Sequence, residues 1–274
     1  MPSASALRIQ IENALERRFP SALTPQPRTI RETASTGIPE VDRLLDGGLP
    51  VGAISEITGP VSSGRTSLAL AFLAQRTSED RVCAWVDAND SFDSESAAAN
   101  GVVLKQLLWV RCKNPLPGPQ RPTHPNLPHP NLPRPDFSVP IFSSLAQALR
   151  ATDLLLQAGG FAALVLDLGS TAPEHAARVP LATWFRFRQA ADRTRCSLLV
   201  LAQEPLSQSS AAVVLECAPL AAQSASQTVL SGCSYQVRTG RQSSSTKTLS
   251  ITGQRKPPAV EWSATGVGQR EASA

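Results

Sequence analysis

The chain is poor in aromatic and charged residues. Aromatic side chains make up 5% of its 274 residues and charged ones 18%, whereas hydrophobic residues as a whole reach 42%. That apolar content, mostly alanine, leucine and valine, is sufficient for a packed core. The length suits one large domain or two small ones.

Two further absences exclude whole classes of protein. No run of about 18 apolar residues occurs, so we expect no membrane span and no membrane partner. The opening MPSASALRIQIENALERRF carries both signs of charge and lacks the continuous apolar stretch of a signal peptide. The sequence therefore predicts a cytoplasmic protein.

Cysteine pairs with metal-ligand spacing are also missing. No CxxC occurs, and the cysteines lie mostly in apolar, strand-like stretches, at Cys83, Cys112, Cys196, Cys217 and Cys233. This pattern predicts reduced core thiols rather than a metal site. The net charge of +4 gives only a mild bias toward polyanions, and ordinary solubility explains it equally well.

Proline marks the boundaries along the chain. Residues 1–34 read as a short helix, 5–19, followed by a proline-containing connector, and the core is expected over 35–262. Ten prolines fall within 114–140, which predicts a disordered or polyproline-II insertion in that core. The small, polar residues 263–274 are expected to form a flexible tail.

Strand-like and helical patterns alternate through the core. The expected helices are 39–46, 66–77, 143–158 and 180–195, and the expected strands are 53–58, 82–86, 107–110, 161–168, 197–202, 211–217, 234–239 and 247–251. Alternation followed by consecutive strands predicts an α/β fold. Its central sheet is expected to be mostly parallel, with an antiparallel extension.

The most informative motif joins the first strand of the core to its apolar helix. Residues 59–66 read GPVSSGRT, the spacing of the phosphate-binding loop G-x-x-x-x-G-K-[ST]. Backbone N–H groups of such a loop and the helix N-terminus attract phosphates. The candidate nucleotide-binding residues are Gly59, Ser62, Ser63, Gly64, Arg65, Thr66 and Ser67. A plain glycine turn between strand and helix is the alternative.

One residue of this motif departs from the pattern. Arg65 stands where a phosphate loop has lysine, and a planar guanidinium does not reproduce the geometry of a compact ammonium. The Thr66 hydroxyl and Asp167, at the end of ALVLD, are the candidate Mg²⁺ ligands. Because the backbone cradle does not depend on the lysine, binding of ATP with Mg²⁺ stays an open expectation.

The segment STGIPEVDRLLDGGLPVGAISEITGPVSSGRT, at 35–66, together with CAWVDANDSFD resembles the nucleotide-binding core of RecA. Over the whole chain, the leader LRIQIENALERRFPSALTPQPR followed by TGIPEVDRLLDGGLP is similar to the ImuA family. That family comprises shortened, SulA-like RecA relatives from bacterial SOS mutagenesis cassettes. The resemblance implies a RecA-like P-loop NTPase core preceded by a short N-terminal helix.

The resemblance also assigns roles to two polar residues. Asn89 falls where RecA has the glutamate that activates water, and Gln203 matches the glutamine that senses the γ-phosphate. A neutral amide cannot accept the proton of water, and loss of a general base typically costs about 10²–10⁴ in rate. We therefore expect a degenerate ATPase with no active catalytic residue.

The partners implied by the resemblance are an ImuB-like Y-family protein and an error-prone DnaE-type polymerase, with RecA and single-stranded DNA as further possibilities. The segments that match the DNA loops of RecA, 170–179 and 204–210, are short. Weak candidates for DNA or partner contact are Arg186, Arg188, Arg238 and Arg241. A solvated basic face is the commoner explanation for such arginines.

Three functions remain open at this point. The first is an accessory protein of SOS-induced translesion synthesis with little or no ATP hydrolysis. The second is an ATP-dependent, DNA-binding recombinase of the RecA type, which the intact glycines, Thr66, Asp167 and Gln203 support. The third, an SOS-linked inhibitor of cell division, rests only on the SulA-like name given to relatives.

Overall fold

A computed structural model of the chain describes residues 32–112, 142–226, 229–242 and 259–265. The predicted helix 5–19, the proline-rich insertion 114–140 and the predicted strand 247–251 lie outside these ranges. Within them, no helix is both long enough and apolar enough to cross a membrane.

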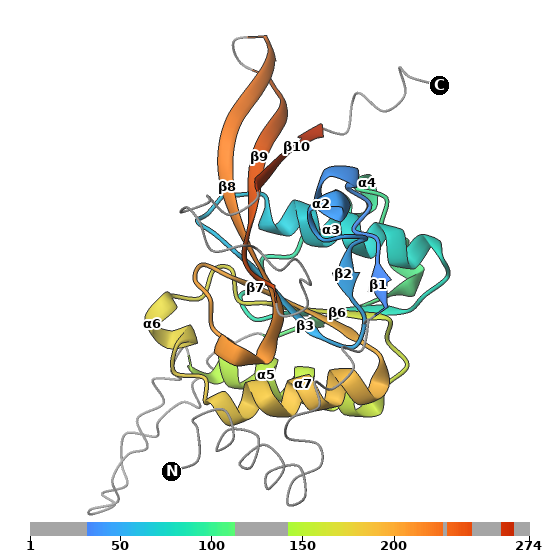
Figure 1. The fold of residues 1–274 in the computed structure, drawn as a ribbon, viewed down its shortest axis with the longest axis vertical. Helices are drawn as coiled ribbons and strands as arrows, with labels where there is room; N and C mark the ends of the chain where they lie inside the picture. The colour runs from blue at the N-terminus through green and yellow to red at the C-terminus, as the bar shows by residue number, and fades with distance from the viewer. Residues whose placement is uncertain (1–31, 113–141, 227–228, 243–258, 266–274) are drawn as a thin grey trace, which may run out of the picture. The chain divides into compact units, whose positions relative to one another are not determined.

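An eight-stranded sheet forms the centre of the described fold (Figure 1), in the order β10-β9-β8-β3-β7-β6-β4-β5. The strands are β3 (Ile54–Thr58), β4 (Cys83–Asp87), β5 (Leu107–Arg111), β6 (Ala163–Asp167), β7 (Ser197–Ala202), β8 (Ala211–Ser226), β9 (Val229–Gln242) and β10 (Ala259–Thr265). Neighbours from β8 to β5 are parallel, whereas β8–β9 and β9–β10 are antiparallel. The predicted mostly parallel sheet with an antiparallel extension is confirmed.

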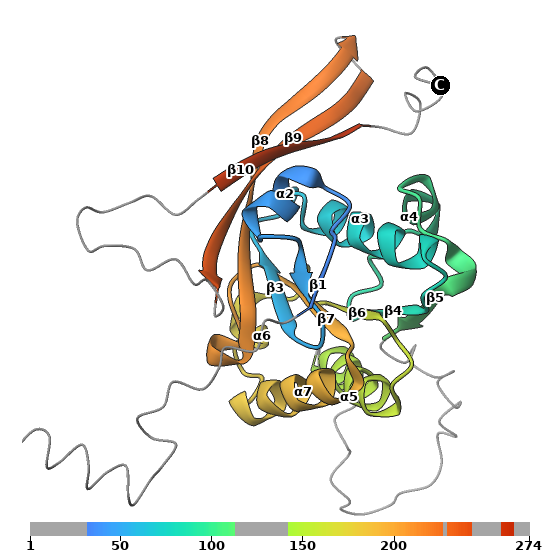
Figure 2. The same ribbon diagram turned by 45° about the vertical axis from the view of Figure 1, so that its right-hand side comes forward.

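Helices cover both faces of the parallel part (Figure 2). One face carries α2 (Pro39–Leu44), α3 (Arg65–Ser78) and α4 (Ser94–Ala99), and the other carries α5 (Phe142–Ala158) and α7 (Leu181–Thr194). Shorter elements are β1 (Thr33–Ala34), β2 (Leu49–Pro50), α6 (Pro173–Ala176) and the 3₁₀ turns η1 (Leu104–Gln106) and η2 (Gln208–Ser210).

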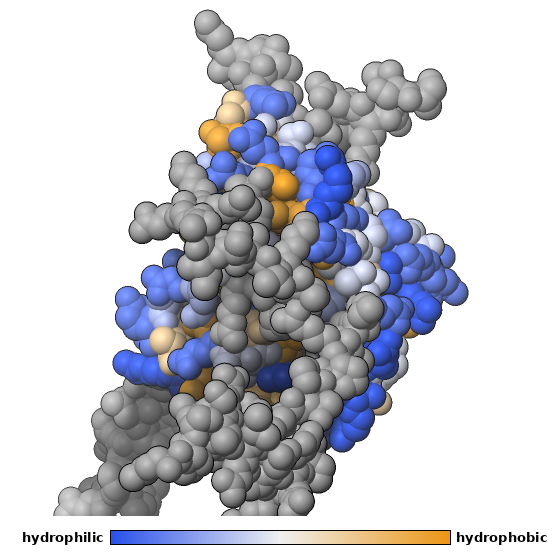
Figure 3. All heavy atoms as spheres, viewed as in Figure 1, coloured by the Kyte–Doolittle hydropathy of each residue, from blue (hydrophilic) through white to orange (hydrophobic). Residues whose placement is uncertain are grey.

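Burial on both faces explains the continuous apolar run of β6. Val165 packs into the core beneath α3, while Leu164 and Leu166 pack into the core beneath α5 and α7. All five residues of this strand are buried, as expected for a strand covered on both sides. On the face viewed in Figure 3, hydrophilic side chains cover most of the described surface and apolar patches are small.

Short elements lie at both ends of the expected core. We expected the core to begin at residue 35. Thr33 and Ala34 precede it and form β1, which pairs with β2. At the other end, β10 continues to Thr265, beyond the predicted end of the core at residue 262. The expected strand 211–217 is the first part of the longer β8, and 234–239 is the middle part of β9. The small, polar residues that continue these strands show no apolar alternation.

Candidate functional site

The candidate site lies where the parallel strands end. The loop 59–64 follows β3 and leads into α3, Asp87 and Asp167 end the neighbouring strands β4 and β6, and Gln203 follows β7. In open α/β sheets, ligands bind outside the carboxyl ends of the strands. The topology therefore gathers the motif residues at the edge of the sheet where a ligand is expected.

Two glycines give the loop its path. Gly59 has φ +146°, and a Cβ there would lie 2.2 Å from the carbonyl oxygen of Cys217. Gly64 has φ +87°, and a Cβ there would meet the ring of Tyr235. Both positions therefore require glycine for space as well as for conformation. Ser62, at φ +61°, is also in the left-handed region, so the loop turns as tightly as the motif predicts.

A small cavity of about 160 Å³ lies beside this loop, below the roughly 300–1,000 Å³ typical of small-molecule sites. The loop contributes Val61 and Ser62 to its lining, α3 contributes Arg65 and Thr66, and Ser91, Asp167, Gly169, Ser170 and Leu201 complete it. The structure thus brings Arg65, Thr66 and Asp167 together, as the motif predicts. Ser63 is buried, and Ser67 lies one residue past the cavity on α3.

Arg65 turns into this cavity instead of out toward solvent. Its side chain is buried, with 8% of the residue exposed, and its Nη2 donates to the carbonyl oxygen of Gly169 at 3.2 Å. Burial lowers the pKa of Arg65, and the nearby Asp167 carboxylate opposes that shift. The guanidinium therefore lies next to the predicted metal-binding carboxylate.

Two carboxylates lie side by side at the strand ends. Asp87 and Asp167 are register partners, and Asp87 accepts hydrogen bonds from the backbone N–H groups of Ser91 at 3.0 Å and Phe92 at 2.8 Å. Asp167 accepts from the N–H of Gly169 at 2.9 Å. Burial and then repulsion from Asp87 raise the pKa of Asp167, whereas Gly169, the Ser91 hydroxyl and Arg65 lower it.

The two polar residues named by resemblance meet at one residue of the segment that follows β6. Asn89 Nδ2 donates to the Thr171 hydroxyl at 3.1 Å, and Gln203 Nε2 donates to the Thr171 carbonyl oxygen at 3.3 Å. Arg65 contacts the same segment at Gly169. The structure therefore places Arg65, Asn89 and Gln203 around one short loop, residues 168–171.

A divalent cation does not fit this arrangement. Thr66 and Asp167 face one cavity, as Mg²⁺ ligands of a phosphate loop would, but the Arg65 guanidinium lines the same small space. A positive charge next to Asp167 repels a second cation there. No cluster of three or more histidine, cysteine, aspartate or glutamate side chains with metal-binding geometry occurs in the part of the chain that the structure describes.

An aromatic pair from the antiparallel extension covers the start of α3. An ideal Cβ on Gly64 would lie 2.7 Å from Cγ of Tyr235, and burial, followed by the neighbouring Cys233, raises the pKa of the Tyr235 phenol, whereas Ser67 lowers it. The rings of Tyr235 and Trp262 lie 4.9 Å apart. Sequence analysis did not find these residues as part of the site, because they lie in strands far along the chain from the loop.

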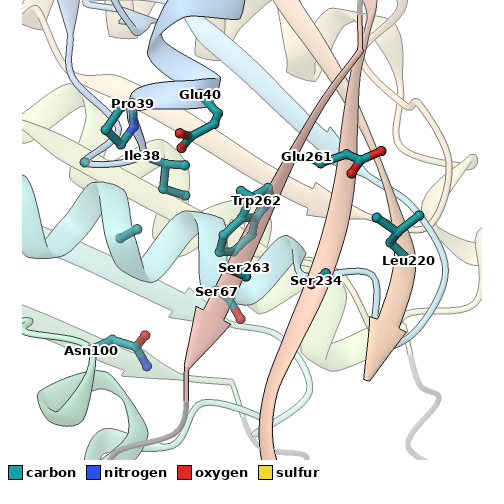
Figure 4. Close-up of a pocket in the computed structure, with 12 residues that line it drawn as sticks. Ile38, Pro39, Glu40, Ser67, Asn100, Leu220, Ser234, Glu261, Trp262 and Ser263 are labelled. Atoms are coloured by element: carbon teal, nitrogen blue, oxygen red, sulfur yellow. The ribbon is translucent and has the colours of Figure 1, made fainter. Parts of the chain in front are cut away.

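A larger cavity, of about 500 Å³, lies between α2, α3 and β10 (Figure 4). Pro39 and Glu40 line it from α2, Ser67 from α3 and Trp262 from β10. The Nε1 atom of Trp262 is buried and has no hydrogen-bond partner among the residues placed in the structure. The only sequence signal for this wall is the alternation of AVEWSAT, which the prediction assigned partly to the tail.

A buried glutamate anchors the segment after β7. Glu56, on β3, is fully buried, and its Oε1 accepts hydrogen bonds from the N–H groups of Leu206 at 3.0 Å and Ser207 at 2.6 Å. Between this anchor and Gln203 only Glu204 and Pro205 are exposed. The short segment that we compared with a DNA loop is therefore held against the sheet.

The four weak arginine candidates do not form one basic site. Arg186 and Arg188 are exposed on α7, whereas Arg238 and Arg241 are on β9. Arg186 is paired with Asp153 at 3.0 Å and Arg238 with Glu216 at 3.5 Å. Two of these guanidinium groups are thus paired with carboxylates at the surface. This favours the interpretation that the arginines belong to a solvated face of the protein.

Comparison with known proteins shows that the first part of the chain is similar to RecA. Residues 6–116 match the family model of the RecA N-terminal domain. Protein RecA of Crocosphaera subtropica is 42% identical over 100 residues, which cover 35% of this chain and 29% of that protein. Protein RecA of Trichodesmium erythraeum is 46% identical over 77 residues, 28% of this chain and 21% of that protein. The match spans less than a third of the length of either relative.

The crystal structure of the RadB recombinase is similar to a larger part of the chain. It aligns with a TM-score of 0.52 and 17% sequence identity, covering 77% of this chain and 90% of that one. At this level of identity the match shows the fold alone, a mixed α/β architecture with a mostly parallel sheet.

Proposed function

Because this chain is RecA-like in the part that holds its phosphate loop, we propose that it is a RecA-derived accessory protein of SOS-induced translesion DNA synthesis. In this role it acts as an adaptor with little or no ATP hydrolysis. The observation that carries the proposal is the position of Arg65, which replaces the expected lysine and points its guanidinium at Gly169 beside Asp167.

The chemistry of hydrolysis supports the proposal from two sides. Phosphoryl transfer needs a cation on the developing charge and a group that positions or deprotonates water. Arg65 is bound to the Gly169 carbonyl, and the amide of Asn89 donates to Thr171 and has no basic group. Both parts of the apparatus are therefore altered in one site, while the backbone path of the loop is retained.

A phosphate-release assay tests the enzymatic half of this proposal. The purified chain is assayed with ATP and Mg²⁺, with and without single-stranded DNA, beside an active RecA protein as positive control. We expect no turnover above background in either condition. Turnover close to that of the RecA control would contradict the proposal.

The adaptor role also makes a prediction about partners. By resemblance, these are an ImuB-like Y-family protein and an error-prone DnaE-type polymerase. Tagged chain recovered from cells after DNA damage is expected to capture both, identified by mass spectrometry, with undamaged cells and an unrelated tagged protein as controls. Recovery of neither partner under conditions in which both are expressed would refute the adaptor role.

The alternative of an ATP-dependent recombinase is favoured by one observation. Thr66, Asp167 and Gln203 all lie at the carboxyl ends of the parallel strands, where a nucleotide-responsive site requires them. This reading requires ordered filaments on single-stranded DNA that depend on ATP. Electron microscopy of the chain with DNA and ATP distinguishes the two functions, and we expect no such filaments.

A further inference from the structure

We propose that Arg65 is a built-in cation that holds the loop 168–171 against the start of α3 without metal or nucleotide. The inference rests on the proposed function in one respect, that the phosphate loop is a former nucleotide site. It goes beyond that function because it assigns Arg65 a positive role and does not describe it only as a lost lysine.

The contacts of Gly169 carry the first step. Its N–H donates to Asp167 Oδ1 at 2.9 Å, and its carbonyl oxygen accepts from Arg65 Nη2 at 3.2 Å. An ideal Cβ on Gly169 would lie 3.1 Å from Asp167 Oδ1 and 3.4 Å from both Nη atoms of Arg65. One glycine thus connects the carboxylate of β6 to the guanidinium of α3.

The second step is the charge balance at the strand ends. Asp87 and Asp167 are adjacent and buried, and burial of neighbouring carboxylates is unfavourable without a compensating positive charge. The positive charge of Arg65 lowers the pKa of Asp167. Arg111, which is paired with Asp90, also interacts electrostatically with Asp87. In phosphate-loop proteins the corresponding carboxylate holds a Mg²⁺ ion, and here the Arg65 guanidinium lines the same small cavity as Asp167.

The third step is the choice of arginine. A guanidinium presents several N–H donors in a plane, so it donates to a carbonyl through one nitrogen while its charge faces a carboxylate. A lysine ammonium is a single compact charge and lacks that geometry. Nη1 of Arg65 is buried without a hydrogen-bond partner in the described part of the chain, so the bond from Nη2 to the Gly169 carbonyl is the direct contact that fastens the guanidinium to the loop.

The loop is therefore fastened from several directions by groups of the chain itself. Besides Arg65, Asn89 holds the Thr171 side chain and Gln203 holds the Thr171 carbonyl. In a nucleotide-driven switch these connections would be expected to form and break with the γ-phosphate. In this chain the donors are the side chains of Arg65, Asn89 and Gln203, so we expect the loop to keep one arrangement.

Hydrogen–deuterium exchange measured by mass spectrometry tests the proposal on the full chain. Peptides that cover 168–171 are followed with no addition and with adenylyl imidodiphosphate plus Mg²⁺. The variants are Arg65→Met and the charge-neutral pair Arg65→Met with Asp167→Asn. The matched control is Arg43→Met, which removes an exposed arginine from α2.

In the wild-type chain we expect protection of 168–171 that does not change when the analogue and Mg²⁺ are added. Arg65→Met is expected to speed exchange there about ten- to a hundredfold, since one hydrogen bond from a charged donor is lost. The double variant relieves the buried charge of Asp167 and is expected to keep the fold while its loop also exchanges fast. Arg43→Met is expected to match the wild type.

Two results would overturn the inference. One is a wild-type loop that gains protection only when the nucleotide analogue and Mg²⁺ are present, which needs no variant to observe. The other is a folded Arg65 variant, single or double, whose loop exchanges at the wild-type rate. A chain that hydrolyses ATP but shows the Arg65-dependent protection would refute the proposed function and leave this inference standing.

Discussion

Replacing Gly64 by alanine would force the phosphate loop and the antiparallel extension apart. The new Cβ would lie 2.7, 2.8 and 2.9 Å from three carbons of the Tyr235 ring, closer than real Cβ contacts come. The residue would also have to keep φ near +87°. Since the loop cannot change its path without losing the start of α3, we expect the Tyr235 ring to move.

The cost has two parts of comparable size. Holding an L-residue in the left-handed region costs about 1–2 kcal/mol. Displacing Tyr235 from its contact with Trp262, 4.9 Å away, loses about 0.5–1.5 kcal/mol of aromatic pairing. The sum is about 1.5–3.5 kcal/mol, which for a chain of this size lowers Tm by roughly 3–14 °C.

A double-mutant cycle separates the two parts. Thermal and urea unfolding are measured for the wild type, Gly64→Ala, Tyr235→Ala and the double variant. In the Tyr235→Ala background the glycine substitution is expected to cost only its backbone part, about 1–2 kcal/mol. An equal cost in both backgrounds would refute the claim that the tyrosine ring covers Gly64.

Three further predictions concern the rest of the fold. On α7, Phe187 is fully buried, so Phe187→Ala is expected to lower the free energy of unfolding by about 3–5 kcal/mol. Phe185 is 54% exposed, and Phe185→Ala is expected to change that free energy by no more than about 0.5 kcal/mol. Similar urea midpoints for the two variants would contradict the burial of this face of α7. Burial raises the pKa of four thiols, to about 12 at Cys83, Cys196 and Cys217 and to about 11 at Cys112. Because the thiolate is the reactive form, iodoacetamide at pH 8 is expected to label these four cysteines only after unfolding. Peptide mass spectrometry of the labelled chain checks this. Hydrogen bonds from the Ser96 side chain, then from backbone N–H groups, lower the pKa of Asp93, the N-cap of α4, so its contribution to stability is complete at neutral pH and is lost as the pH falls below about 4. Asp93→Asn is expected to weaken the acid dependence of Tm between pH 5 and 3, and an unchanged dependence would rule the cap out as its source.

The arrangement of the sheet follows from the sequence because burial dictates the pattern of each strand. The run ALVL that precedes Asp167 is apolar at every position, as expected for a strand covered on both faces, and it forms β6. The motif GPVSSGRT is equally predictive, since its glycines occupy backbone conformations and close approaches that other residues do not tolerate. The loop, Arg65, Thr66 and Asp167 therefore come together as the sequence indicates.

Local sequence patterns do not predict where individual side chains point. The motif predicts an altered site at Arg65, but the contact of its guanidinium with Gly169 depends on where the segment after β6 runs. The cover over Gly64 depends on Tyr235, which the β8–β9 pairing brings to the loop from far along the chain. Such contacts arise from tertiary packing, and neither periodicity nor motif spacing reports them.

The anchoring of residues 206 and 207 by Glu56 has a consequence for recognition. A surface loop that must settle into one shape when a partner arrives gives up part of the interaction energy as lost conformational freedom. The exposed turn at Glu204 and Pro205 has already settled, because both of its ends are fixed to the centre of the sheet. A partner that binds at Glu204 and Pro205 meets a turn whose conformation is already fixed. Its affinity there depends on how well its shape and charge complement the turn.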